Sequence, residues 1–222
     1  MIRVVLLDVD GTLVDSNDAH ARAWVQAFED EGIAVEYEAV RRCIGMGGDK
    51  LMPAVSSIEE STPTGQRIAA RRREIFKGFL PTLKPFPEAG ALVAALVEAG
   101  YRCVAASSAK RDELSALLHL AGADSLLHAA TSSDDADEST PDPDIVHAAM
   151  ARAGVTPAEA VMIGDTPYDV EAAGRARVPA IAFRCGGWRD TDLRGAIAIY
   201  NGPWDLLRQF DASPLGVRRK TG

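Results

Sequence analysis

The sequence predicts an α/β protein with a doubly wound parallel sheet as its core and an all-helical segment inserted after the first strand. Short apolar runs bounded by turn residues alternate along the chain with segments of helical period. Several of these runs are apolar at successive positions, which is typical of strands covered by helices on both faces. The repetition of strand, helix and strand indicates a parallel sheet with right-handed crossovers.

Six apolar runs are candidate strands, and three segments between them are candidate crossover helices. The strands are expected at residues 3–9, 101–107, 125–131, 160–165 and 179–183, with 196–200 as a candidate sixth. The helices are expected at residues 87–100, 142–154 and 168–176. In the second helix, Asp142 is the predicted N-cap and Pro143 the first helical residue.

One long segment interrupts this alternation, because it contains helical patterns and no convincing strand. We therefore expect two domains: an α/β core formed by residues 1–16 and 85–222, and a helical cap domain formed by residues 17–84. The run Arg71–Arg73 lies within the inserted segment, where we interpret it as a solvated helix face rather than a binding patch.

Composition restricts the classes of protein to which this chain can belong. The 222 residues carry a formal net charge of −8, which argues against nucleic acid or an anionic membrane as a partner. No apolar run approaches 18 residues, and the N-terminus shows no signal-peptide pattern. Cys43, Cys103 and Cys185 lie far apart, which favours idle thiols in a reducing compartment. We expect a cytoplasmic globular protein.

Polar side chains follow three of the predicted strands at the points where those strands end. They are Asp8 and Asp10 after the first strand, Ser107 and Ser108 after the second, and Asp165 and Asp169 after the fourth. Ligands of an open parallel sheet lie beyond the carboxyl ends of its strands, so these side chains should meet at one edge. Clustered carboxylates require a cation, and an oxygen-only ligand set favours Mg²⁺. Hydroxyl groups beside a helix N-terminus suit a phosphate group.

The spacing of the first two aspartates allows them different tasks. Residues two apart on a strand point to the same face, so Asp8 and Asp10 can both reach one ligand. One carboxylate can then attack phosphorus while the other manages the proton of the leaving oxygen.

Three motifs resemble those of the haloacid dehalogenase (HAD) superfamily. The stretch "DVDGTLVDS" at residues 8–16 is similar to the first motif, Ser107 to the second, and "GDTPYD" at residues 164–169 to the metal-binding motif. The helical insert lies where members with a C1-type cap carry theirs. The resemblance extends to the phosphoglycolate phosphatase and β-phosphoglucomutase-like group, and it implies a Rossmann-like core with a cap.

The resemblance also implies roles for individual residues. Asp8 would be the nucleophile that forms an aspartyl-phosphate, and Asp10 the general acid and then the general base. Mg²⁺ would be held by the Asp8 carboxylate, the Asp10 backbone carbonyl and Asp165, with Asp169 in support. Ser107 would bind phosphoryl oxygens.

Further residues are candidates for phosphate or substrate binding. Thr12 fits the phosphatase version of the first motif, and the presence of Asp10 disfavours dehalogenation, since dehalogenases proper lack this second aspartate. Ser108 belongs with Ser107. In relatives of this kind, positions such as His20 and Lys50 in the cap adjoin the cleft.

The chain departs from the family at one position. Capped members usually carry a lysine in a K-P-x-P-D pattern, whereas "STPDP" at residues 139–143 places Thr140 there. Losing one preorganised charge of this kind typically costs a factor on the order of 100 to 1000 in rate. Lys110 could substitute, the protein could be a weak or non-catalytic relative, or the threonine could be a single change in an ordinary enzyme.

These observations together predict a Mg²⁺-dependent phosphatase that hydrolyses a small phosphorylated metabolite. A monomer or a weak homodimer is expected, with neither nucleic acid nor a membrane as partner. Two alternatives stay open: a phosphomutase of the β-phosphoglucomutase type, and a non-catalytic relative that binds phosphate and Mg²⁺.

Overall fold

The sheet is parallel throughout, as the sequence predicts. The computed structural model describes residues 1–135 and 139–216. In chain order, the strands are β1 (Val4–Leu7), β2 (Arg102–Ala106), β3 (Ala129–Thr131), β4 (Ala160–Gly164), β5 (Ala180–Phe183) and β6 (Ala198–Tyr200). Their order across the sheet is β3-β2-β1-β4-β5-β6, and every neighbouring pair is parallel. The α/β class is confirmed, including the candidate sixth strand.

The apolar runs form strands that are covered on both sides. All four residues of β1 are fully buried. Val5 and Leu7 pack into one hydrophobic cluster, whereas Val4 and Leu6 pack into the cluster on the opposite face. This division follows from the alternation of side chains along a strand. Because β1 pairs with both β2 and β4, the carboxyl ends of the three strands lie side by side.

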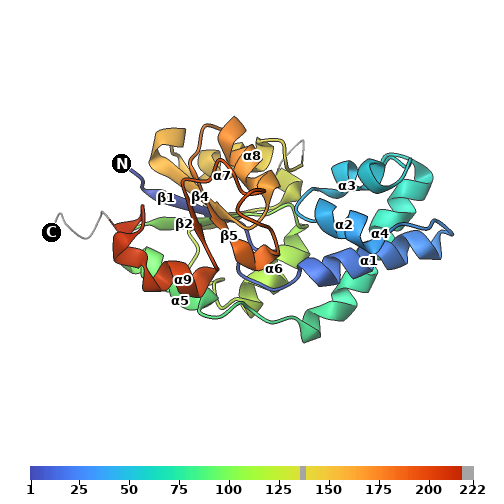
Figure 1. The fold of residues 1–222 in the computed structure, drawn as a ribbon, viewed down its shortest axis with the longest axis horizontal. Coiled ribbons are helices and arrows are strands. Elements are labelled where there is room, and N and C mark those ends of the chain that lie inside the picture. Colours follow the sequence, from blue (N-terminus) through green and yellow to red (C-terminus); the bar gives the residue numbers. More distant parts are fainter. Residues whose placement is uncertain (136–138, 217–222) are drawn as a thin grey trace.

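Helices cover the two faces of the sheet in separate layers. Their bounds are α5 (Ala89–Glu98), α6 (Arg111–Leu120), α7 (Asp144–Ala153), α8 (Pro167–Arg175) and α9 (Pro203–Arg208). Apolar residues of α5, α6 and α9 join the first cluster, and those of α7 and α8 join the second. Figure 1 shows α7 and α8 on one side of the strands, with α5 and α9 on the other.

The predicted N-cap of the second crossover helix is wrong by one residue. The helix α7 begins at Asp144, with Pro143 in the N-cap position. The Asp142 carboxylate is engaged elsewhere, since Arg175 Nη1 lies 2.8 Å and Lys50 Nζ 3.2 Å from its oxygens. These cations hold the side chain away from the amide groups of the first helical turn.

Four helices follow β1 and pack around a hydrophobic cluster of their own. They are α1 (Asn17–Asp30), α2 (Tyr37–Cys43), α3 (Gly48–Val55) and α4 (Pro63–Phe79). They lie together beyond the end of the sheet (Figure 1). Where the segment leaves and rejoins the sheet, Asp15 N donates to Lys84 O at 3.0 Å. This contact lies at the predicted domain boundary, although the division into two domains stays a prediction.

The helices within the described part of the chain are all too short or too polar to cross a membrane. Short 3₁₀ helices complete the structure at Leu80–Thr82, Ser133–Asp135, Pro157–Glu159, Arg184–Gly186 and Phe210–Ala212.

Candidate active site

A cavity of about 460 Å³ lies where the helices α1 to α4 face the carboxyl edge of the sheet. The sheet with its flanking helices and the four helices that follow β1 both contribute residues to the walls of this cavity. The sheet side supplies Asp8, Asp10, Ser107, Ser108, Lys110, Glu113, Thr140 and Asp169, among others. The helical side supplies His20, Trp24, Gly47, Asp49, Glu60, Arg72 and Arg73, among others.

Three carboxylates from the ends of two neighbouring strands meet in this region, as the sequence predicts: Asp8 follows β1, Asp165 follows β4, and Asp169 lies in the first turn of α8. Oxygen atoms of Asp8, Asp165 and Asp169 all lie within 4.8 Å of one another. Burial raises the pKa of Asp8 well above its ordinary value, and the charges of Asp169, Asp165 and Asp10 raise it further. Burial, followed by the charge of Asp169, raises the pKa of Asp165 to about 7. Mutually repelling buried carboxylates fit a hard divalent cation such as Mg²⁺.

Thr12 holds two of these carboxylates together. Its Oγ1 lies 2.9 Å from Asp8 Oδ2 and 2.9 Å from Asp165 Oδ1. The Thr12 side chain is fully buried, and Thr12 is not among the described residues that line the cavity. A hydroxyl group carries one proton, so it can donate to one of the two oxygens at a time. This position supports a role in orienting Asp8 and Asp165 instead of the predicted contact with phosphate.

Sequence analysis did not identify two residues that adjoin Asp165. Asn17 Nδ2 donates to Asp165 Oδ2 at 2.9 Å, and Gly186 leaves room for the same oxygen, since a Cβ there would lie 1.7 Å from it. Asn17 and Gly186 come from distant parts of the chain, so no local pattern identifies them.

Asp169 is oriented by a capping box at the start of α8. Thr166 N and Thr166 Oγ1 donate to Asp169 Oδ2 at 3.0 and 2.7 Å, and Asp169 N donates back to Thr166 Oγ1 at 3.2 Å. The T-x-x-D spacing of residues 166–169 resembles a capping box, so the hydrogen bonds between Thr166 and Asp169 could have been predicted from the sequence.

The surroundings of Asp10 lower its pKa, whereas those of Asp8 raise the pKa of Asp8. Asp10 Oδ1 accepts a hydrogen bond from Ser16 Oγ at 2.5 Å and lies 2.7 Å from His20 Nε2. Burial alone would raise the pKa of Asp10, but His20, Ser16 and the charge of Arg72 together lower it. In the metal-free chain these surroundings favour the ionised form of Asp10 and the protonated form of Asp8.

Hydroxyl groups occupy the side of the cavity around Thr140. Thr140 is buried, and its Oγ1 lies 2.8 Å from Ser108 Oγ. Ser107 is also buried, and its Oγ accepts a hydrogen bond from Ala109 N at 3.1 Å. These three side chains can offer hydrogen bonds to a phosphate but no positive charge.

The two candidate lysines are both engaged by acids. Lys110 Nζ lies 2.9 Å from Asp134 Oδ1 at the rim of the cavity, and its side chain is 47% exposed. Lys50 pairs with Asp142 and, within the described residues, does not line the cavity. The position of Lys50 therefore gives no support to its predicted contact with substrate.

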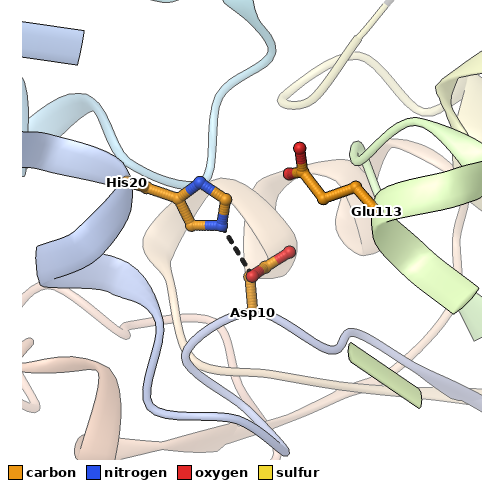
Figure 2. Close-up of side chains that lie close together, drawn as sticks. All are labelled: Asp10, His20 and Glu113. Atoms are coloured by element: carbon orange, nitrogen blue, oxygen red, sulfur yellow. Dashed lines mark hydrogen bonds and ion pairs between the residues drawn. The ribbon is translucent and has the colours of Figure 1, made fainter. Parts of the chain in front are cut away.

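The interpretation of Arg71–Arg73 as a solvated face is wrong for Arg72 and Arg73, which both line the cavity. Arg71 is exposed and pairs with Asp30, but the Arg72 side chain is only 15% exposed and lines the cavity. Arg72 contacts Glu113 of α6 and His20 of α1, and its guanidinium carbon lies 5.6 Å from the centre of the Trp24 ring. Figure 2 shows His20 and Glu113 on either side of Asp10.

The site and the fold together define a hydrolase class. The chain belongs to the haloacid dehalogenase-like hydrolase family, whose match spans residues 5–183. Over 218 residues it is 30% identical to a phosphoglycolate phosphatase of Aquifex aeolicus, with 95% of this chain and 97% of the relative covered. The resemblance stated from the motifs is thereby confirmed, and the relatives support the expected phosphatase class.

A second relative is much longer than this chain. The protein SUPPRESSOR OF QUENCHING 1, chloroplastic, of Arabidopsis thaliana is 34% identical over 209 residues, which are 91% of this chain. They are 19% of that protein, so the chain spans about a fifth of its length. Among solved structures, a hydrolase from Pseudomonas syringae matches with a TM-score of 0.89 and 27% identity, covering 96% of this chain and 99% of that one.

Proposed function

We propose that this protein hydrolyses a small phosphomonoester in a Mg²⁺-dependent reaction that passes through an aspartyl-phosphate on Asp8. One observation carries the proposal: Asp8 faces the cavity from the end of β1, and one of its oxygens lies within 4.8 Å of one oxygen each of Asp165 and Asp169. Family membership and the phosphatases among the relatives support the same reaction class.

The cation would be held by the Asp8 carboxylate, the Asp10 backbone carbonyl and Asp165, with Asp169 in support. When bound, Mg²⁺ would offset the negative charge of the carboxylates and of the phosphoryl group. Thr12 and Asn17 would keep Asp8 and Asp165 oriented toward it through their hydrogen bonds.

Asp8 and Asp10 would carry out the two chemical steps, which are phosphoryl transfer to Asp8 and hydrolysis of the aspartyl-phosphate. An Asp8 oxygen attacks phosphorus, the bond from phosphorus to the ester oxygen breaks, and Asp10 gives a proton to the departing alcohol. Asp10 then takes a proton from water, which attacks the phosphorus of the aspartyl-phosphate and releases inorganic phosphate and free Asp8. Ser107 and Ser108 would donate hydrogen bonds to the phosphoryl oxygens.

Substrate choice would rest on the helical segment that closes the cavity. We infer that residues 17–84 act as a cap domain that excludes water from the phosphoryl group. A cavity of about 460 Å³ has room for a small metabolite. The phosphoglycolate phosphatase relative makes phosphoglycolate the first compound to test.

The test is phosphate release from a panel of small phosphomonoesters, including phosphoglycolate, with and without Mg²⁺. Asp8→Asn serves as the blank, because it removes the nucleophile and keeps the size of the side chain. Release that requires both Mg²⁺ and Asp8 supports the proposal. Transfer of the phosphoryl group within a sugar phosphate would indicate a mutase. Binding of Mg²⁺ and orthovanadate without any turnover would indicate a non-catalytic relative.

A further inference from the structure

Two side chains of opposite charge line the cavity without an ion pair or a hydrogen bond of their own. Arg73 belongs to α4, and Glu60 lies in the loop between α3 and α4. Both are half-buried, and within residues 1–135 and 139–216 neither side chain pairs with another group. A partly desolvated charge that lacks a partner is costly, so both side chains can gain from a ligand that supplies one.

The other arginine and lysine side chains of the cavity wall are already engaged. Arg72 Nη1 donates to Glu113 Oε2 at 2.9 Å, and Lys110 Nζ lies 2.9 Å from Asp134 Oδ1. Among the described residues that line the cavity, Arg73 can therefore meet an anionic group of a ligand without giving up an acid. A guanidinium group suits a carboxylate, because it can donate two parallel hydrogen bonds to it.

The surroundings of Glu60 favour a cationic partner. Burial raises the pKa of Glu60, and the charge of Asp49, which also lines the cavity, raises it further. A Cβ at Gly48 would lie 2.9 Å from Glu60 Oε2 and 3.1 Å from an atom of the buried Trp24 ring, so the carboxylate lies beside an indole. An ammonium group would bring both hydrogen-bond donors and the positive charge that these two neighbouring carboxylates need.

Arg73 and Glu60 are near enough to act on the same part of a ligand. Of the charges that oppose the rise in the Glu60 pKa, that of Arg73 has the largest effect. The two side chains nevertheless form no ion pair with each other. A ligand that carries a carboxylate next to an ammonium group would satisfy both of them at once.

We propose that Arg73 and Glu60 are specificity-determining residues that bind the carboxylate and the ammonium group of a phosphorylated amino acid. The inference rests on the proposed function, in which Asp8 receives the phosphoryl group in the same cavity. An α-amino acid carries both charged groups on one carbon atom, and its phosphorylated side chain would extend toward Asp8. Phosphoglycolate offers a carboxylate to Arg73 but leaves Glu60 without a partner.

The first test compares four phosphomonoesters of primary alcohols that differ in these charged groups. O-phospho-L-serine carries both groups, 3-phosphonooxypropanoate carries only the carboxylate, phosphoethanolamine carries only the ammonium group, and ethyl phosphate carries neither. We expect each charged group to raise kcat/KM by about 10- to 100-fold, which is the range for a hydrogen bond to a charged partner.

Single substitutions should remove these gains selectively. Arg73→Met should abolish the gain from the carboxylate and keep that from the ammonium group, Glu60→Gln should do the reverse, and Arg73→Lys should recover part of the loss. Arg71→Met and Glu59→Gln are matched controls, since Arg71 is exposed and pairs with Asp30, and Glu59 is an exposed neighbour of Glu60. Each control should change kcat/KM for all four compounds by less than about twofold.

Two outcomes would overturn the inference. One is an equal loss on all four compounds in Arg73→Met or in Glu60→Gln, which would indicate a general structural role. The other is a similar kcat/KM for all four compounds in the unmodified chain.

Binding without turnover separates this inference from the proposed function. Calorimetric titration of Asp8→Asn with O-phospho-L-serine in Mg²⁺ should show binding that is about 10-fold weaker when Arg73→Met or Glu60→Gln is added. Such binding, together with no hydrolysis of any of the four compounds by the unmodified chain, would refute the proposed hydrolysis and support the recognition of the amino acid group. Hydrolysis with no preference for either charged group would support the proposed function and overturn the inference.

Discussion

Replacing Asp165 by asparagine should make the metal-free protein more stable while abolishing its response to Mg²⁺. The substitution removes one charge from the cluster of Asp8, Asp165 and Asp169 and keeps the shape of the side chain. The new amide can also be accommodated, because Asn17 Oδ1 is buried without a hydrogen-bond partner in the described structure. A flip of the Asn17 amide would present this oxygen to the nitrogen introduced at position 165.

The magnitude follows from the raised pKa of Asp165. Below the ordinary pKa of 3.8 the carboxyl group is protonated in both the folded and the unfolded state, so it costs no stability. The cost grows as the pH rises toward the folded-state value of about 7 and is complete above it. The pKa of Asp165 rises from 3.8 to about 7 on folding. At about 1.4 kcal/mol for each pKa unit, the ionised Asp165 carboxylate destabilises the metal-free fold by up to about 4 kcal/mol.

The assay is thermal unfolding at pH 5 and pH 7.5, with EDTA or with excess Mg²⁺. For a chain of this size, 1 kcal/mol corresponds to about 2–4 °C in Tm. In EDTA, Asp165→Asn should raise the Tm by several degrees at pH 7.5 and by less at pH 5, and Mg²⁺ should stabilise only the unmodified chain. Asp15→Asn, at an exposed position near the site, is the control. A lower Tm for Asp165→Asn at pH 7.5 in EDTA would refute the reasoning.

Three further substitutions test individual contacts, and a fourth serves as a control. Thr140→Lys should raise kcat by roughly 100- to 1000-fold, because it restores a preorganised charge; an unchanged kcat in phosphate release would show that another group already supplies it. Lys110→Ala should lower turnover by less than about fivefold, since Lys110 is half-exposed and paired with an acid, and complete loss would identify it as the substitute cation. Gly186→Ala should destabilise the fold by about 1–3 kcal/mol and weaken the thermal shift with Mg²⁺, because the added Cβ would lie 1.7 Å from Asp165 Oδ2. Gly174→Ala, in helix α8 with open space around it, should instead be neutral or stabilising in the same unfolding assay.

Patterns confined to short stretches of the chain were sufficient to predict the sheet and the edge at which its carboxylates lie. Every strand of the sheet falls on a predicted apolar run, because a parallel strand buried on both faces must be apolar at successive positions. Asp8 and Asp165 were expected at one edge because each follows a predicted parallel strand, and the observed pairing of β1 with β4 makes them neighbours. Local pattern was less reliable at helix ends, where Asp142 pairs with Arg175 and Lys50 instead of capping α7.

What the sequence by itself determined is therefore the α/β class, the family motifs and the carboxylates at the strand ends, since each depends on periodicity or on spacing within a few residues. Only the tertiary structure decided that Arg72 is buried between His20 and Glu113, that Thr12 spans two carboxylates, and that Lys50 lies outside the cavity lining. Those contacts join side chains that are far apart in sequence, and they depend on how the helical segment packs against the sheet. Periodicity and spacing within a few residues do not predict that packing.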